Sequence, residues 1–192
     1  MTDHITIYGA SSPDIDPRFM EAARQLGALI GARGVTLVSG GGRTGLMAAA
    51  IEGASMAGGK TVGILPQFMI DRRWGHPQLH TTVATPDMHT RKRQMASMSG
   101  AVIALPGGVG TLEELLEIIT WRQLGLYQGN IVILNTLNYF DPLLQMLARS
   151  IELHFMNPDH KALWQVASTP EEAVSLALDV EPENRPFTQK IH

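Results

Sequence analysis

Two charged side chains stand out because each falls on an otherwise uncharged stripe of a predicted helix. Arg91 belongs to the helix predicted over residues 88–98, and Glu114 to the helix predicted over residues 111–124. A charge on such a face has to be paired or has to face a binding site. A carboxylate in that position can accept a proton or stabilise developing positive charge, although acids also favour the first turn of a helix through its dipole. The helical neighbours are Met88, Met95 and Met98 for the arginine, and Thr111, Ile118 and Trp121 for the glutamate.

The remaining charges of these two helices divide into different classes. Arg93 lies off the stripe and is expected to be solvated, whereas the sequence leaves the position of Lys92 open. Glu113 and Glu117 are four residues apart and therefore share one helical face. The sequence thus separates Glu114 from the two acids beside it.

Two glycine-rich loops each leave a predicted strand and open a predicted helix. They are Ser39–Gly45 (SGGGRTG) and Pro106–Thr111 (PGGVGT). Glycine lets the backbone approach a ligand closely, and a helix start presents free N–H groups that attract anions. Thr111 could cap its helix or contact a phosphate oxygen. The first loop fits the dinucleotide pattern GxGxxG, but no acid follows it at the distance that a ribose needs, so NAD is disfavoured.

Short apolar segments alternate along the chain with longer helical patterns. Strands are predicted at 5–9, 35–38, 60–65, 81–84, 101–105, 131–134 and 164–167, and helices at 19–32, 44–57, 88–98, 111–124, 139–155 and 170–178. Residues 66–86 are otherwise expected to be irregular. This alternation predicts a single-domain α/β fold over 1–180: a doubly wound, mostly parallel, Rossmann-like sheet with helices on both faces. Ligands bind such sheets outside the carboxyl ends of the strands. Residues 181–192 are expected to form a polar C-terminal tail.

Composition excludes several classes of protein. The chain has 192 residues, a formal net charge of -3 and no cysteine, so it offers no disulfide and no overall charge that would attract nucleic acid or an anionic membrane. The seven histidines show no metal-ligand spacing, and we expect no metal. No leader peptide or membrane-spanning segment is apparent, which favours a cytoplasmic location.

Two motifs together carry a family resemblance. Residues 106–114 read PGGVGTLEE, and upstream residues 88–92 read MHTRK, which match the patterns PGGxGTxxE and MxxRK. The chain therefore resembles the LOG (Lonely Guy) family of cytokinin riboside 5′-monophosphate phosphoribohydrolases, which were earlier described as lysine decarboxylases. The resemblance extends over nearly the whole chain.

The resemblance implies hydrolysis of the N-glycosidic bond of an adenosine 5′-monophosphate, often N6-substituted, to a free base and ribose 5-phosphate. It implies a homodimer with sites near the subunit interface, and no cofactor. Arg91 and Glu114 fall on the catalytic positions of the family. The implied substrate-binding positions are Met88, Lys92, Gly107, Gly108, Val109, Gly110, Thr111, Glu113 and Thr120.

One departure from the family pattern bears on the substrate. Arg73 stands where family members carry an acid, in a segment expected near the base or the dimer partner. Two alternatives stay open: a broader purine nucleoside-5′-monophosphate nucleosidase, and a non-catalytic carrier of a nucleotide or of the molybdenum cofactor on the same fold. The presence of both Arg91 and Glu114 disfavours a carrier, because a carrier needs a phosphate site but no acid. A lysine decarboxylase is disfavoured because Lys60, Lys92 and Lys161 lie in no evident pyridoxal-phosphate setting.

Overall fold

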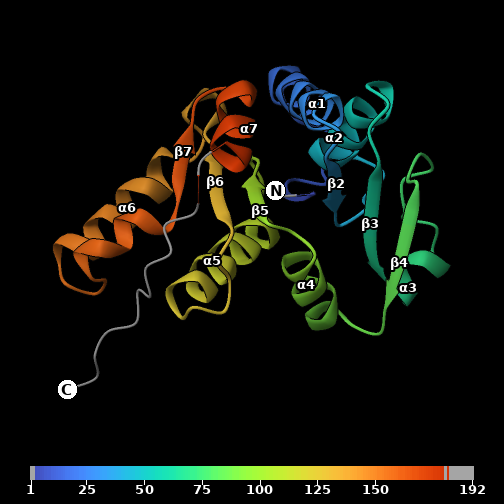
Figure 1. Ribbon diagram of the computed structural model, residues 1–192. Helices are drawn as coiled ribbons and strands as arrows, with labels where there is room; N and C mark the ends of the chain where they lie inside the picture. Colours follow the sequence, from blue (N-terminus) through green and yellow to red (C-terminus); the bar gives the residue numbers. More distant parts are fainter. Residues whose placement is uncertain (1–2, 180, 182–192) are drawn as a thin grey trace.

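The fold consists of one seven-stranded parallel sheet with helices on both faces (Figure 1). The computed structural model describes residues 3–179 and 181. The strands are β1 (His4–Tyr8), β2 (Thr36–Ser39), β3 (Thr61–Pro66), β4 (Thr81–Thr85), β5 (Ala101–Ala104), β6 (Asn130–Leu134) and β7 (Gln165–Ala167). The α-helices are α1 (Pro17–Ala32), α2 (Gly45–Met56), α3 (Gln67–Asp71), α4 (Met88–Ser97), α5 (Val109–Gln123), α6 (Asp141–Glu152) and α7 (Pro170–Leu178). Two short 3-10 turns, Thr136–Asn138 and Pro158–Leu163, flank α6.

The strand order places a topological switch point at the centre of the sheet. The order is β4-β3-β2-β1-β5-β6-β7, and every pairing is parallel. The chain therefore moves outward from β1 in one direction and then returns to place β5 on its other side. Residues after β1 and after β5 together line a pocket there, at the position where such sheets bind ligands. The predicted doubly wound fold is confirmed.

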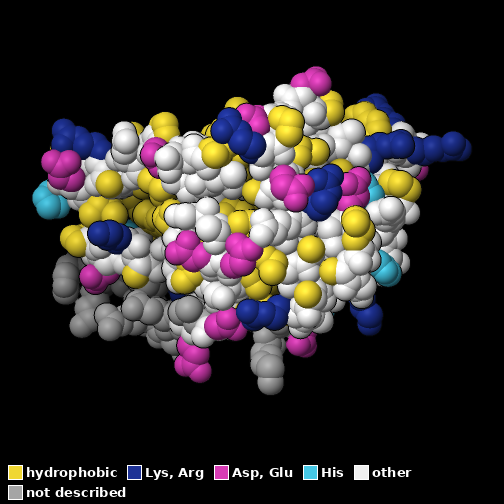
Figure 2. Space-filling model, turned by 90° about the horizontal axis from the view of Figure 1, so that it is seen from above, with side chains coloured by type: hydrophobic (Ala, Val, Ile, Leu, Met, Phe, Trp, Pro, Cys, Tyr) yellow, Lys and Arg dark blue, Asp and Glu magenta, His cyan; other side chains and the backbone are white. Residues whose placement is uncertain are grey.

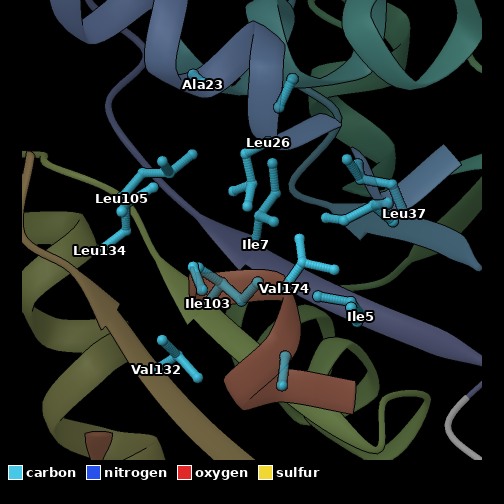
Figure 3. Close-up of a cluster of buried hydrophobic side chains, with 14 of the residues drawn as sticks. Ile5, Ile7, Ala23, Leu26, Leu37, Ile103, Leu105, Val132, Leu134 and Val174 are labelled. Carbon is cyan, nitrogen blue, oxygen red and sulfur yellow. The ribbon is translucent and has the colours of Figure 1, made fainter. Parts of the chain in front are cut away.

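Each face of the sheet packs against its own group of helices. In Figure 1, α1, α2 and α7 cover one face, and α4 and α5 cover the other. The first core contains Ile5, Ile7, Leu26, Ile103 and Val174, which meet between β1, β5, α1 and α7 (Figure 3). The second contains Val38, Val102, Met95 and Ile118. Burial on both faces explains why the strands are continuous apolar segments rather than alternating ones.

The structure corrects several predicted boundaries. The helix predicted over 139–155 begins only at Asp141, because Leu137 and Asn138 have φ of 53° and 60° and Pro142 lies in the first turn. α5 begins at Val109, two residues before the predicted start. The irregular region 66–86 contains α3, while its predicted strand is confirmed as β4. The predicted tail, 181–192, lies outside the described residues except for Glu181.

The face of the molecule seen from above carries no extended field of one charge. Figure 2 shows acidic and basic side chains interspersed with hydrophobic ones on the face seen from above. Among the described helices, none combines the length and the hydropathy that a membrane crossing would need.

Candidate active site

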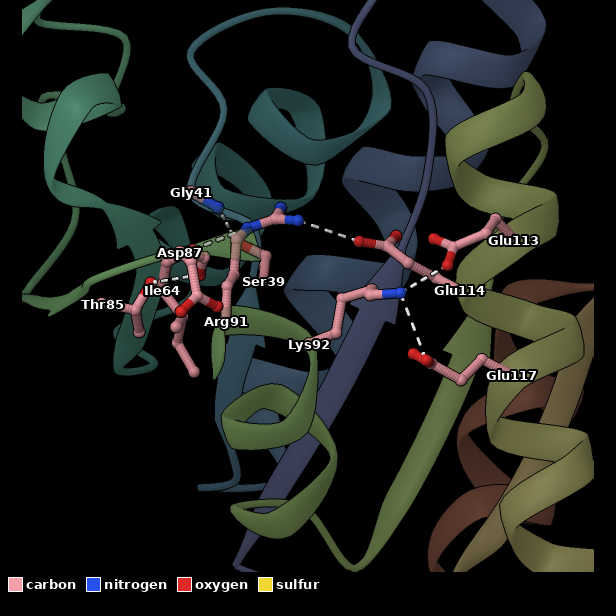
Figure 4. A network of polar contacts seen from close by, with 10 residues as sticks. All are labelled: Ser39, Gly41, Ile64, Thr85, Asp87, Arg91, Lys92, Glu113, Glu114 and Glu117. Atoms are coloured by element: carbon pink, nitrogen blue, oxygen red, sulfur yellow. Dashed lines mark hydrogen bonds and ion pairs between the residues drawn. The ribbon is translucent and has the colours of Figure 1, made fainter. Parts of the chain in front are cut away.

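Arg91 is buried at the carboxyl end of the sheet, where α4 and α5 approach each other. Its Nε donates to the carbonyl oxygen of Ile64, at the end of β3, over 3.0 Å. Its Nη1 donates to Glu114 Oε1 on α5, also over 3.0 Å. The guanidinium thus joins the β3 backbone to the carboxylate (Figure 4), and the predicted need for a partner is confirmed. Because the two bonds use different nitrogens of a planar group, they fix the orientation of the arginine.

Glu114 is held in a largely desolvated position beside this arginine. Its side chain is 14% exposed, and burial raises its pKa above 4.5, the ordinary value for glutamate, although the charge and hydrogen bond of Arg91 oppose this rise. Since α5 starts at Val109, Glu114 lies in the second turn and not in the first. The helix dipole is therefore a poor reason for an acid at this position, and a role for the carboxylate in a site is favoured.

Lys92 forms a second ion-pair cluster next to the first. Its Nζ contacts Glu113 Oε1 and lies 3.2 Å from Glu117 Oε1, so the two acids share the predicted face (Figure 4). Burial alone would lower the pKa of Lys92, but its bonds to both carboxylates raise it overall. The lysine is therefore a fixed cation. Lys92 also belongs to the buried face of α4, together with Arg91, Met95 and Ala96, whereas Arg93 is exposed as predicted.

The first glycine loop makes room for the arginine. A Cβ on Gly40 would lie 1.8 Å from Arg91 Nη2, so a larger residue fits there only if the guanidinium moves. Two residues of this loop, Gly41 and Gly45, have φ of 70°, which favours glycine there as well. The first glycine loop, whose binding of an anion stays a prediction, therefore accommodates the arginine.

Gly40→Ala is expected to displace Arg91 and to lower the activity proposed below by about 100-fold, because a misplacement of about 1 Å at reacting groups has that effect. The measurement is steady-state turnover together with the melting temperature. Gly75→Ala is the matched control, since its added Cβ would meet nothing closer than Leu65 Cδ2 at 3.6 Å. Full activity of Gly40→Ala would contradict the positioning role of this contact.

The second glycine loop lies at the switch point and forms the start of α5. Gly108 precedes the helix, and the positions beside Gly108 and Gly110 open to free space. Gly107 packs closely instead, because an added Cβ would lie 2.1 Å from Thr111 Oγ1. Gly108 is the N-cap of α5 and no side chain caps the helix, so the alternative that the Thr111 hydroxyl is a cap is wrong, while its contact with a phosphate oxygen stays a prediction. The start of α5 has free N–H groups, as every helix start does, and Gly107 and Gly108 line a pocket beside it.

The other predicted binding positions are spread more widely. Met88 and Val109 are exposed, by 39% and 84%. Glu113 lies beside Lys92, whereas Thr120 is exposed and its hydroxyl donates to Leu116 O over 2.8 Å. Thr120 lies nine residues beyond Thr111 on α5, about 14 Å along the helix, and is therefore remote from the second glycine loop.

Two partners of Arg91 are marked as such by no motif of the sequence. The carbonyl of Ile64 carries no side-chain signal, and Gly40 gave only the general signal of a glycine loop.

Arg73, at the acid position of the family, has φ of 58°, and its carbonyl accepts a hydrogen bond of 3.0 Å from Arg43 Nη1. This contact ties the segment around Arg73 to the loop that packs on Arg91. Within residues 3–179 and 181, no group of three or more potential metal ligands occurs.

Comparison with known proteins identifies the family. A family model described as "possible lysine decarboxylase" matches residues 47–177. Cytokinin riboside 5′-monophosphate phosphoribohydrolase LOG7 of Arabidopsis thaliana is 36% identical over 187 residues, which cover 97% of this chain and 86% of the relative. The chain belongs to the LOG family. LOG1 of the same plant is 34% identical over 186 residues, which cover 97% of this chain and 87% of the relative.

Solved structures share the fold of this LOG family member. The molybdenum cofactor binding protein of Rippkaea orientalis superposes with a TM-score of 0.71 and 27% identity, over 90% of this chain and 93% of that one. The molybdenum cofactor carrier protein of Chlamydomonas reinhardtii gives 0.67 and 24%, over 90% and 92%, and shows the fold alone. The family model is described as a possible lysine decarboxylase, but the ammonium group of Lys92 is held between two glutamates. This disfavours Lys92 as the free amine that a decarboxylase would use.

Proposed function

We propose that this LOG family member hydrolyses the N-glycosidic bond of adenosine 5′-monophosphates, with N6-substituted, cytokinin-type nucleotides as preferred substrates. The observation that carries the proposal is the buried Arg91–Glu114 pair beside an open helix start. The curated relatives are named for this reaction. Water adds to C1′ of the ribose, the bond to the base breaks, and the base takes up a proton, which gives free base and ribose 5-phosphate.

Each part of the site has a task in this reaction. Bond cleavage builds positive charge on the sugar, which the Glu114 carboxylate stabilises while it accepts a proton from the attacking water. Arg91 keeps this carboxylate ionised and oriented, and its two hydrogen bonds favour that task over contact with the departing base. The start of α5, Gly107 to Thr111, binds the 5′-phosphate and thereby positions the sugar. Met88, Lys92 and Glu113 lie around the bound nucleotide.

The reaction is tested with the purified protein, without added metal. AMP and N6-isopentenyl-AMP are supplied separately, and the free base is followed by chromatography. Faster release from the N6-substituted nucleotide would support the proposal, and equal rates would favour the broader purine nucleotide nucleosidase. Binding of nucleotide without release of base would refute hydrolysis and favour a carrier.

Thr120 supports the further proposal that the enzyme is a homodimer. It lies nine residues from Thr111 along α5, about 14 Å at the rise of an α-helix, which is too far for both to hold one phosphate. It lines an exposed, largely apolar groove along this helix, formed by Val109, Leu112, Glu113, Leu116, Glu117, Thr120 and Trp121. We infer that a second copy covers this groove, so that Thr120 of one subunit lies near the site of the other.

Leu116→Arg is expected to weaken this dimer by about 30-fold, since a charge at the centre of an apolar contact costs about 2 kcal/mol. The measurement is molar mass by light scattering over a dilution series. Met56→Arg, on the remote helix α2 at an 81% exposed position, is the control and should leave the mass unchanged. A monomeric wild-type protein would contradict the proposal.

A further inference from the structure

Tyr139 contacts the second glycine loop from a distant part of the chain. Its hydroxyl donates to the carbonyl oxygen of Gly107 over 2.7 Å, across 32 positions of sequence. Tyr139 follows β6, beside the first turn of α6, and no motif of the sequence points to it. The contact therefore adds a side chain to the site that the family patterns do not include.

The backbone that carries Tyr139 is held in an unfavourable conformation. Leu137 and Asn138 are consecutive non-glycine residues with φ of 53° and 60°. Such residues persist only where the surroundings determine them, and they concentrate at functional sites. Here Asn135 supplies the restraint, since its Oδ1 accepts from Phe140 N over 2.7 Å and its Nδ2 donates to Asp141 Oδ1 over 2.8 Å. The strained turn thus sets the position of the tyrosine.

The ring of Tyr139 is fixed as well. It meets Phe19 edge-on with ring centroids 6.1 Å apart, and Phe140 at 5.1 Å. It also forms one wall of a pocket of about 220 Å³ at the switch point, whose other lining residues include Ser12, Pro106, Gly107 and Gly108. Because both the backbone and the ring are restrained, the Tyr139 hydroxyl is held at the carbonyl of Gly107 before the substrate binds. Substrate binding therefore costs no further conformational freedom of Tyr139.

This hydrogen bond acts on a peptide that joins two glycines. In a trans peptide the C=O and N–H groups point in opposite directions, so a carbonyl held on Tyr139 turns the N–H of Gly108 away from it. Neither Gly107 nor Gly108 has a Cβ that would oppose a flip of the peptide between them. A flip would place a carbonyl oxygen, which repels phosphate, where this N–H stands.

We propose that Tyr139 is a positioning residue that locks the Gly107–Gly108 peptide in the orientation that binds the 5′-phosphate of the substrate. The inference rests on the phosphate site of the proposed function. It assigns to Tyr139 an effect on the phosphate end of the ligand and none on the cleavage of the glycosidic bond. Removal of the hydroxyl should therefore weaken the binding of phosphorylated ligands and leave the chemical step unchanged.

The test is Tyr139→Phe, which keeps the aromatic contacts and removes one hydroxyl. We expect the affinity for ribose 5-phosphate, measured by calorimetry, to fall about 10-fold, while ribose binds as weakly as before. KM for the nucleotide should rise by the same factor, with kcat within twofold of the wild-type value. Tyr127→Phe is the matched control, because that buried hydroxyl has no hydrogen-bond partner among the described residues.

The outcomes separate this inference from the proposed function. Unchanged affinity and KM in Tyr139→Phe would overturn the lock, as would a fall in kcat with KM unchanged. If the wild-type protein releases no base but binds ribose 5-phosphate in a Tyr139-dependent way, the hydrolase assignment fails and the lock stands. An equal loss in Tyr127→Phe would also overturn it, because the effect would then not be specific to the loop.

Discussion

Replacement of Glu114 by glutamine is expected to lower kcat for the release of base by about 10²- to 10⁴-fold, the usual contribution of a positioned acid–base group. Glutamine has nearly the same shape, and its amide oxygen can still accept the hydrogen bond from Arg91 Nη1. It carries no charge and cannot take a proton from water at neutral pH. The loss should therefore appear in kcat, while KM for the nucleotide changes little.

The measurement is the rate of base release under saturating substrate, together with the melting temperature of the variant. Glu21→Gln, on the outer surface of α1 with a 71% exposed side chain, serves as the matched control and should retain full activity. A loss in KM alone would show that Glu114 binds the substrate without taking part in the cleavage. Wild-type rates in the variant would refute the proposed mechanism.

Replacement of Arg91 by glutamine is expected to lower kcat/KM at pH 7 by about 10- to 100-fold and to move the acid limb of the pH profile to higher pH. Activity needs the ionised form of Glu114, so it is lost as the pH falls through the pKa of this carboxyl. Burial already raises that pKa, and Arg91 opposes the rise. Without the arginine the pKa rises further, and a larger share of the enzyme is protonated and inactive at neutral pH.

The profile of kcat/KM between pH 4.5 and 9 tests this expectation, since it reports the free enzyme. Arg93→Gln is the control, because Arg93 is an exposed arginine on the same helix and should leave the acid limb in place. A uniform loss of activity with an unshifted limb would show that Arg91 acts on the substrate and not through Glu114.

Local patterns in the sequence predicted most of the elements of this fold. The continuous apolar strands and the amphipathic helices between them indicated a doubly wound sheet, and the strand order confirms it. Errors arose where one residue depends on distant partners. The start of α6 was misplaced because Asn135 stabilises an unfavourable turn through contacts that the local pattern does not contain. Lys92 stayed open because its burial depends on Glu113 and Glu117, which lie on another helix.

Periodicity and motif spacing are local properties of the chain, and they predict the fold class, the family and the need for a partner at both Arg91 and Glu114. The folded chain adds what these patterns do not contain: the two residues pair with each other, the Ile64 carbonyl and Gly40 contact the arginine, and Tyr139 donates to the carbonyl of Gly107. These contacts join segments more than 20 residues apart, and several involve backbone atoms that every residue shares. No residue type in the sequence indicates these contacts, because they form only when the folded sheet brings the ends of its strands together.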